Sequence, residues 1–216
     1  MRFIRERRLV IDFARKMNDQ GLNQGTSGNV SVRVEDGFLL TPTGIAYEDL
    51  TIEDLVEVRH DGRVPGFQRT PSSEWRIHRD VYLARGEANA VVHAHPMFAT
   101  TLAMLRRDIP AVHYMIAVAG GSTVRCSGYA TFGTEELSRL ALQALEGRKA
   151  CLLANHGMLA VGKDLPEAFK IAREIEFLAA QYWRALQVGE PHVLDDAEME
   201  RVLEKFQTYG QQKRKW

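Results

Sequence analysis

The sequence predicts an α/β fold in which helices cover both faces of a mixed sheet. Segments of alternating apolar and polar residues are interleaved with segments of helical periodicity, as in a layered α/β domain. Several strands are joined by short turns, so the sheet is mixed rather than wholly parallel. The 216 residues are 45% hydrophobic and 26% charged, which is typical of a globular protein, and we expect one domain over residues 1–216.

The N-terminal part is expected to open with a helix and continue into hairpins. Apolar residues recur at helical spacing over residues 4–20, and Gly21 provides a C-cap. Residues 30–34 alternate like a half-buried strand, and an acidic turn ending at Gly37 leads back into a second strand at 38–41. The strand-like residues 55–58, followed by Asp61-Gly62, predict another hairpin.

The rest of the chain alternates helices with short apolar strands. The pattern predicts helices at 73–85, 96–105, 134–146, 165–188 and 197–206, and strands at 91–95, 115–119 and 150–154. Pro96 and Pro166 stand near helix starts, where a missing N–H costs least. Gly120 and Gly189 follow segments that they are expected to end.

Composition excludes several classes of partner. Lys+Arg and Asp+Glu both number 28, so no net positive field favours nucleic acid or an anionic membrane. Cys126 and Cys151 lack the Cys-x-x-Cys spacing and are interpreted as reduced thiols. No signal peptide is recognised at the N-terminus, and no segment approaches the roughly 20 apolar residues of a membrane span. We therefore expect a cytoplasmic protein that binds neither nucleic acid nor membranes.

Two histidines at the end of an apolar strand indicate a metal site. His93 and His95 are two residues apart, so in a strand both rings leave the same face of the sheet. Glu74, near the start of a predicted helix, and His156, after a second apolar strand, are candidate partners. Three imidazoles and a carboxylate suit one Zn²⁺ ion per subunit, although other divalent metals also accept these ligands.

Three short loops are rich in hydroxyl groups and glycine. They contain Gly25-Thr26-Ser27-Gly28-Asn29, Thr41-Pro42-Thr43-Gly44 and Pro71-Ser72-Ser73. Such groups can bind a phosphate without Lys or Arg, especially at a helix N-terminus. Each loop alone is ordinary loop composition, so only their convergence in space would distinguish a binding site.

A phosphate pocket beside a metal and a carboxylate suggests aldol chemistry. The metal can polarise a ketone while a carboxylate moves a proton and a phenol protonates the second oxygen. Tyr114 and Tyr209 are candidate phenols, although a tyrosine between apolar residues often serves packing alone.

The ordered motifs closely resemble the class II aldolase/adducin family, most strongly its L-fuculose-1-phosphate aldolase branch. The resemblance covers nearly the whole chain and is carried by the segments 21–31, 41–44, 71–75, 93–95, 109–117, 129–134 and 204–210. It implies a three-layer αβα sandwich around a central mixed, mostly antiparallel sheet. It also implies a homotetramer with active sites between subunits.

The resemblance further implies roles for individual residues. His93, His95, His156 and Glu74 would be zinc ligands, and Glu74 would also serve as general base. Tyr114 matches a proton donor, and Tyr209 matches a tail tyrosine that assists the adjoining subunit. The phosphate-binding positions are matched by Gly28, Asn29, Thr43, Gly44, Ser72 and Ser73.

The expected activity is reversible cleavage of a ketose 1-phosphate, of the L-fuculose 1-phosphate type, to dihydroxyacetone phosphate and an aldehyde such as lactaldehyde. 5-Deoxyribulose 1-phosphate and 5-methylthioribulose 1-phosphate are alternative substrates, because family members that use them share the dihydroxyacetone phosphate half. Apolar Met97, Phe98 and Met158 would suit a deoxy or thioether end, although Met and Phe near a strand end more often belong to the core. An epimerase, a dehydratase or a non-enzymatic adducin-like module is less favoured. Tyr114 stands near a position that is acidic in the epimerases, and all four metal ligands are present.

Overall fold

A six-stranded sheet organises the protein, whose computed structural model describes residues 1–208. The strands are β1 Asn29–Val34, β2 Gly37–Leu40, β3 Val56–Arg59, β4 Ala90–Ala94, β5 Ala150–Leu153 and β6 Gly157–Gly162. Their spatial order is β3-β2-β1-β4-β6-β5, and every neighbouring pair is antiparallel. An isolated parallel bridge joins Cys126 and Leu152. The predicted antiparallel character of the sheet is confirmed.

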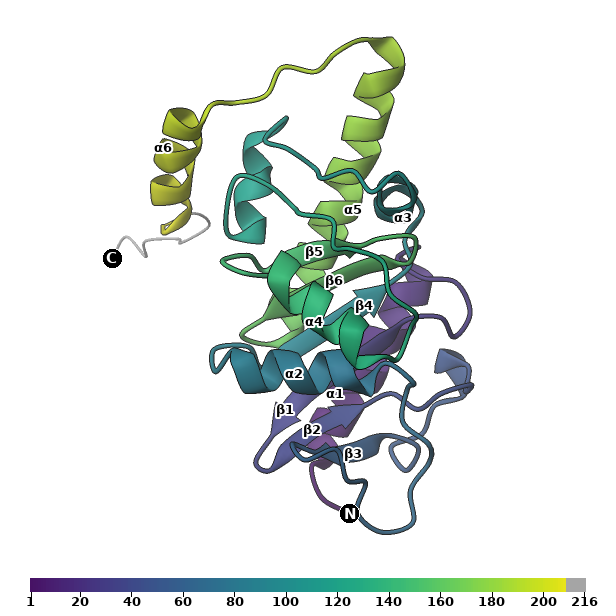
Figure 1. Cartoon of the computed structure of the whole chain (residues 1–216). Coiled ribbons are helices and arrows are strands. Elements are labelled where there is room, and N and C mark those ends of the chain that lie inside the picture. The colour runs from purple at the N-terminus through teal and green to yellow at the C-terminus, as the bar shows by residue number, and fades with distance from the viewer. Residues whose placement is uncertain (209–216) are drawn as a thin grey trace, which may run out of the picture.

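Helices cover both faces of this sheet. The α-helices are α1 Ile4–Asp19, α2 Trp75–Ala84, α3 Met97–Met104, α4 Glu135–Ala144, α5 Leu165–Val188 and α6 Asp196–Phe206, with short 3₁₀ helices η1 Tyr47–Asp49 and η2 Tyr114–Ala119. One hydrophobic core joins α1, α3 and α5 to one sheet face, and a second joins α2 and α4 to the other. Figure 1 shows α2 and α4 crossing the front of the sheet. This arrangement confirms the three-layer αβα fold.

The central strand β4 divides its side chains between the two cores. Val92 and Ala94 pack in the core with α5, whereas Val91 packs in the core with α2. Because a strand alternates its side chains, His93 faces the same side as Val91. The antiparallel partner of His93 on β1 is Asn29, which therefore presents its amide to that same side.

The longest helix, α5, has the predicted bounds and clear signals at both ends. Asp164 caps it by accepting a hydrogen bond from the Glu167 N–H at 2.8 Å, and Pro166 stands in the first turn. Gly189 follows the last helical residue. Its buried stripe packs on β4 and β6, which fixes the end of the sheet that carries the histidines.

Two predicted strands differ from the structure. Residues 115–119 form most of the 3₁₀ helix η2, because the His113 ring accepts the Met115 N–H at 3.1 Å and caps a helical turn. The strand β3 is followed by the predicted turn at Gly62, but no named strand returns after it in the described chain. Pro65 lacks the N–H that a paired strand would donate there.

The last helix lies apart from the layers. Residues 189–195 carry the chain away from α5 to α6, as Figure 1 shows. The helix α6 packs against η2, where the Phe206 and Tyr114 rings meet edge to face with centroids 6.4 Å apart. Among the described residues, no helix has the length and apolar character needed to cross a membrane.

Candidate metal centre

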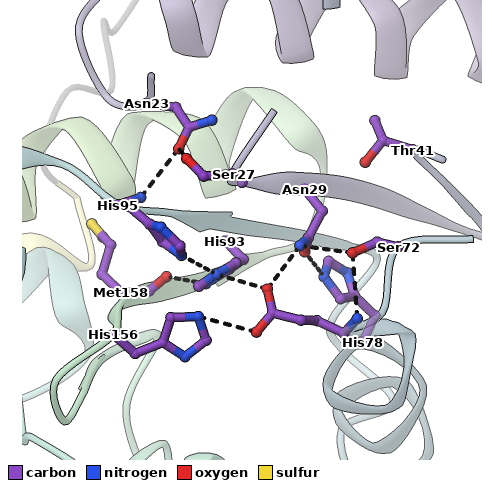
Figure 2. A network of polar contacts seen from close by, with 12 residues as sticks. Asn23, Ser27, Asn29, Thr41, Ser72, His78, His93, His95, His156 and Met158 are labelled. Atoms are coloured by element: carbon purple, nitrogen blue, oxygen red, sulfur yellow. Dashed lines mark hydrogen bonds and ion pairs between the residues drawn. The ribbon is translucent and has the colours of Figure 1, made fainter. Parts of the chain in front are cut away.

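Four predicted ligands converge at one end of the sheet. The candidate ligand atoms of Glu74, His93, His95 and His156 all lie within 4.8 Å of one another. The three imidazole rings are mutually inclined, with centroids 4.8 to 4.9 Å apart. Figure 2 shows the three histidines turned toward a common point beside a carboxylate. The structure thus brings together residues from three distant parts of the chain.

Each ligand is positioned by a strand end or a helix start. His93 is the fourth residue of β4, and His95 follows just beyond the strand on the same side. His156 lies in the tight turn between β5 and β6, where Asn155 adopts a left-handed backbone with φ of 53°. Glu74 is the residue immediately before α2. All four therefore lie within a strand or close to the end of a strand or helix.

The turn approaches His95 so closely that only glycine fits beside it. A Cβ on Gly157 would lie 2.5 Å from the Ala94 carbonyl oxygen and 2.7 Å from Cδ2 of the His95 ring. Both distances are shorter than any ordinary carbon contact, and one involves backbone that cannot turn away. Gly157 therefore permits the start of β6 to lie close to the Ala94 carbonyl and the His95 ring.

The orientation of His93 is fixed by the strand beside it. Its Nδ1 is 2.9 Å from the Met158 carbonyl oxygen, which can only accept, so Nδ1 carries the proton. Nε2 then presents its lone pair to the cluster, 2.9 Å from His95 Nε2 and 2.9 Å from Glu74 Oε2. A backbone carbonyl that sets the tautomer of a ligand histidine is typical of metal sites.

The two oxygens of Glu74 have different surroundings. Oε2 accepts a hydrogen bond from Asn29 Nδ2 at 3.0 Å. Oε1 lies 3.2 Å from His156 Nε2, yet within residues 1–208 it has no partner in hydrogen-bond geometry although it is buried. A buried carboxylate oxygen facing ring nitrogens without an aligned proton fits a cation better than a hydrogen bond. The donor set therefore fits a metal ion.

The protonation states also suit metal binding. Burial opposes the charge on Glu74, but the adjacent His93 and His156 and the Asn29 amide outweigh burial and hold the pKa of its carboxyl well below the usual range. Burial, helped by His93, lowers the pKa of His95 to about 3 and that of His156 to about 4. Burial also lowers the pKa of His93, but Glu74 outweighs it and raises the value. Glu74 thus favours a positive charge next to it, which a metal ion at the cluster would supply.

The hydroxyl-rich loops lie next to this cluster. Ser72 N–H donates to the Thr41 carbonyl at 3.2 Å, and Thr43 N–H donates to the Thr70 carbonyl at 3.1 Å, which joins the second and third loops. Asn29 Nδ2 donates to Ser72 Oγ at 3.0 Å and brings in the first. The convergence that the sequence could only suggest is therefore present.

The six loop residues are not equally accessible. Thr43, Gly44 and Ser73 are exposed, whereas Gly28, Asn29 and Ser72 are buried. At Gly28 a Cβ would stand 2.6 Å from the His93 carbonyl oxygen, so glycine there serves the close packing of β1 on β4. Gly44 has a left-handed φ of 72° with open space around it.

The two candidate tyrosines are not in the cluster. Tyr114 is 46% exposed on η2, and its ring contacts are with His113 and Phe206. Tyr209 lies outside the described residues 1–208.

Two polar residues around the centre were not singled out by the sequence. Asn23 Oδ1 accepts the His95 backbone N–H at 3.3 Å, and His78 Nε2 lies 2.5 Å from Asn29 Oδ1. His78 follows Glu74 by four residues on α2, a spacing that places both side chains on one helix face and could have revealed it. Asn23 lies in the segment 21–31 that carries the family resemblance, but the sequence assigned it no role.

Comparison with known proteins places these features in context. The family model described as "Class II Aldolase and Adducin N-terminal domain" matches residues 8–183. A 5-methylthioribulose-1-phosphate/5-deoxyribulose-1-phosphate aldolase of Rhodospirillum rubrum is 57% identical over 201 residues, covering 93% of this chain and 90% of the relative. An L-fuculose phosphate aldolase of Escherichia coli is 50% identical over 204 residues, covering 94% of both.

A solved structure supports the same relationship. The structure of an L-fuculose 1-phosphate aldolase superimposes with a TM-score of 0.91 at 44% sequence identity, covering 94% of this chain and 96% of the other.

Proposed function

The chain belongs to the class II aldolase and adducin family, and on that premise we propose that it reversibly cleaves a ketose 1-phosphate to dihydroxyacetone phosphate and an aldehyde. It is an aldolase, a carbon–carbon lyase of phosphosugars. The observation that carries the proposal is the convergence of three histidines and one carboxylate beside the hydroxyl-rich loops. This combination joins an electrophilic centre to a place for a phosphate.

We propose Zn²⁺ as the metal, held by Glu74, His93, His95 and His156, since its preferred ligands are nitrogen and oxygen atoms in this number. When bound, the ion supplies a Lewis acid that polarises the carbonyl oxygen of the ketose. Cobalt, manganese and iron share these ligand preferences, so elemental analysis of the purified protein identifies the native ion.

Glu74 is proposed to move the proton at C3 of the dihydroxyacetone phosphate half. In the condensation direction, ionised Glu74 removes that proton, the C3–C4 bond forms, and a proton is added to the new C4 oxygen. Cleavage runs the same steps in reverse, so each proton lost from C4 oxygen is balanced by one gained at C3. Against the opposing effect of burial, the neighbouring His93, His156 and Asn29 lower the pKa of Glu74 and keep it ionised, and a carboxylate oxygen that is released from the metal is the proposed acceptor of the proton.

The proton at the C4 oxygen is assigned to Tyr114, with Tyr209 assisting. Because Tyr114 is exposed and its ring meets Phe206 rather than the ligands of its own chain, we propose that it acts in the site of a neighbouring subunit. This requires an oligomer, and we propose a homotetramer with intersubunit active sites. A cytoplasmic location is proposed as well, which two free cysteines fit.

The substrate phosphate is proposed to bind Gly28, Asn29, Thr43, Gly44, Ser72 and Ser73. Support comes from the backbone and side-chain hydrogen bonds that join their three loops. Exposed Thr43, Gly44 and Ser73 supply the accessible hydroxyls and backbone N–H groups. Buried Asn29 and Ser72 connect the phosphate side to Glu74.

The aldehyde half has two candidates, each with an observation in its favour. The Escherichia coli relative, an L-fuculose phosphate aldolase, supports a hydroxylated end that leaves as lactaldehyde. The 57% identical Rhodospirillum rubrum relative supports a deoxy or methylthio end. Of the three apolar residues expected there, Met158 is fully buried and Phe98 packs on Trp183, whereas Met97, two residues after His95 in sequence, is largely exposed.

The deciding experiment compares kcat/KM for L-fuculose 1-phosphate, 5-deoxyribulose 1-phosphate and 5-methylthioribulose 1-phosphate, with release of dihydroxyacetone phosphate as the readout. The true substrate should exceed the others by roughly tenfold or more, since one apolar or polar group at the variable end changes transition-state binding by about 1–3 kcal/mol. Absence of dihydroxyacetone phosphate from all three would sink the proposal. Epimerised or dehydrated products, or a metal-free protein, would favour the alternatives.

A further inference from the structure

A line of buried polar side chains runs behind Glu74, away from the other metal ligands. The Tyr82 hydroxyl is 2.7 Å from Ser31 Oγ, which is 2.6 Å from His78 Nδ1. His78 Nε2 is 2.5 Å from Asn29 Oδ1, and Asn29 Nδ2 is 3.0 Å from Glu74 Oε2. All five side chains are buried. We call four of these side chains, Tyr82, Ser31, His78 and Asn29, the buried hydrogen-bond series.

Two regular sequence spacings bring the members of the buried hydrogen-bond series together. Glu74, His78 and Tyr82 are four residues apart, so they stand one above another along one face of α2. Asn29 and Ser31 are two residues apart on β1 and share one face of the sheet. That face packs on α2, so helix and strand contribute alternate members.

The donor and acceptor capacity of each group fixes the direction of every hydrogen bond in the buried hydrogen-bond series. Ionised Glu74 can only accept, so Asn29 must turn its NH₂ toward Glu74 and its Oδ1 toward His78. Oδ1 can only accept, so His78 Nε2 carries the ring proton and Nδ1 of the neutral ring accepts from Ser31. Ser31 has then used its proton, so its oxygen accepts from Tyr82.

Burial keeps these protons in place. Burial, together with nearby His93, lowers the pKa of His78 to about 3 against an opposing effect of Glu74, so the ring is neutral at physiological pH. Burial also raises the pKa of the Tyr82 hydroxyl, which therefore remains protonated. The series has one stable arrangement of protons, with all donors pointing toward Glu74.

The Asn29 amide is the point at which this arrangement matters. Its two N–H groups are both used, one by Ser72 Oγ and one by Glu74 Oε2. If the amide turned over, Oδ1 would face the Glu74 carboxylate and NH₂ would face the N–H of His78. The His78 donor therefore opposes that turned orientation and secures a donor for Glu74.

We propose that His78 is a positioning residue, which holds the Asn29 amide as a donor to Glu74 and so keeps the Glu74 carboxylate aimed into the metal centre. The proposal rests on the function proposed for Glu74. His78 itself touches neither substrate nor metal ligand in the described chain, and it acts only through Asn29.

Two substitutions of His78 distinguish the effect of losing the N–H donor from the effect of changing the size of the side chain. His78→Leu removes the donor, whereas His78→Gln can place an amide N–H near the position of Nε2. We expect His78→Leu to lower kcat about tenfold or more and to weaken metal binding, as loss of a residue supporting a ligand does. His78→Gln should recover most of both. The control Ile77→Val trims the buried face of the same helix and should leave kcat unchanged.

A purely structural role would lower the melting temperature of His78→Leu without changing kcat per folded, metal-loaded subunit. That outcome, or equal losses in His78→Leu and His78→Gln, would overturn the proposal. The kcat values of the two variants are expressed per bound metal and per folded subunit, so that partial unfolding is not mistaken for loss of the Asn29 orientation.

A spectroscopic measurement tests the proton arrangement without turnover. In protein labelled with ¹⁵N-histidine, with and without Zn²⁺, His78 should show a protonated Nε2 and an unprotonated Nδ1, opposite to the tautomer of His93. A proton on Nδ1 of His78 would refute the proposal even if the enzyme is fully active. If no ketose phosphate is cleaved, the proposed function fails, while the tautomer and metal affinities still decide the role of His78.

Discussion

At the scale of single residues, two functions are proposed for Glu74, and its two oxygens have different surroundings. Oε2 is held by Asn29, whereas Oε1 faces the ring of His156 without a hydrogen-bond donor among residues 1–208. One oxygen is thus fixed and the other is available. This asymmetry suits a ligand that must also exchange a proton.

Replacing Glu74 by Gln tests this dual role. An amide keeps the shape and a ligand oxygen but cannot accept a proton, so we expect kcat to fall about 10²- to 10⁴-fold, the usual contribution of a general base. Metal content should remain near stoichiometric because His93, His95 and His156 stay in place. The readouts are release of dihydroxyacetone phosphate and elemental analysis.

Glu57→Gln is a matched carboxylate-to-amide control. Glu57 is also buried, but it pairs with Arg59 on the outer part of the sheet, and turnover should stay close to that of the unmodified protein. Unimpaired turnover in the Glu74 variant, with normal metal content, would remove Glu74 from the reaction.

The sequence predicted the metal ligands better than the residues around them. His93 and His95 share a strand end, and that spacing alone places them on one face. The spacing of His78 from Glu74 places both on one face of α2, but its contact with Asn29, far away in sequence, forms only in the folded structure. Contacts across layers depend on packing that no local pattern contains.

At the scale of elements, the turn between β5 and β6 carries a ligand and limits its neighbours. The turn places His156 opposite the end of β4, where β6 pairs with β4 from Ala94 to Ala90. The turn can lie this close to the end of β4 because residue 157 is glycine, whose α-carbon faces the Ala94 carbonyl and the His95 ring.

Gly157→Ala should therefore damage the metal site more than the fold. The added methyl must push either the backbone of β4 or the His95 ring, and we expect metal affinity to fall about 10- to 100-fold, as when a group supporting a ligand is disturbed. Titration of the metal-free protein with Zn²⁺ in the presence of a competing chelator measures the change.

Gly86→Ala is the corresponding control in an open turn, since a Cβ there meets nothing within 4 Å. It should bind metal like the unmodified protein. Equal affinities for the two variants would show that the close approach at Gly157 has no bearing on the site.

Element types were predictable where a signal lay within the element itself. The bounds of α5 were predicted from Pro166 and Gly189 in the local sequence, and the structure adds Asp164 as the N-cap. Residues 115–119 were wrongly predicted as a strand, because a short apolar run has no distinctive period. Its helical turn depends on a cap from the His113 ring.

At the scale of the whole molecule, the metal should contribute to stability as well as to catalysis. A bound ion stabilises the folded state by RT ln(1 + [L]/Kd), about 2.7 kcal/mol at one hundred times Kd. For a chain of this size, chelation should lower the melting temperature by roughly 5–10 °C, and it should abolish cleavage.

Returning Zn²⁺ should restore both properties. In a His95→Ala variant, chelation should change the melting temperature much less, because one of the four ligands is already lost. Cleavage that persists in chelator, with an unchanged melting temperature, would contradict a metal-dependent site.

The proposed sharing of active sites between subunits can be tested by complementation. Glu74→Gln and Tyr114→Phe should each be inactive alone. If the two residues act from different subunits, equal mixing with subunit exchange should restore about one quarter of full activity, because each site then receives its Glu74 and Tyr114 independently. Activity is measured before and after exchange, and no recovery in exchanged mixtures would place both residues in one chain's site.

The strand order also predicts the order in which the parts of the metal site form during folding. Glu74 belongs to the start of α2 and can take its place early, because helices form from local contacts. His93 and His156 meet only after β4 pairs with β6, and Asn29 joins only after β1 pairs with β4. Such pairings close long loops and are slow. During refolding, tight metal binding should therefore occur later than helix formation. A metal-sensitive dye should report the pairing of the central strands rather than the first collapse of the chain.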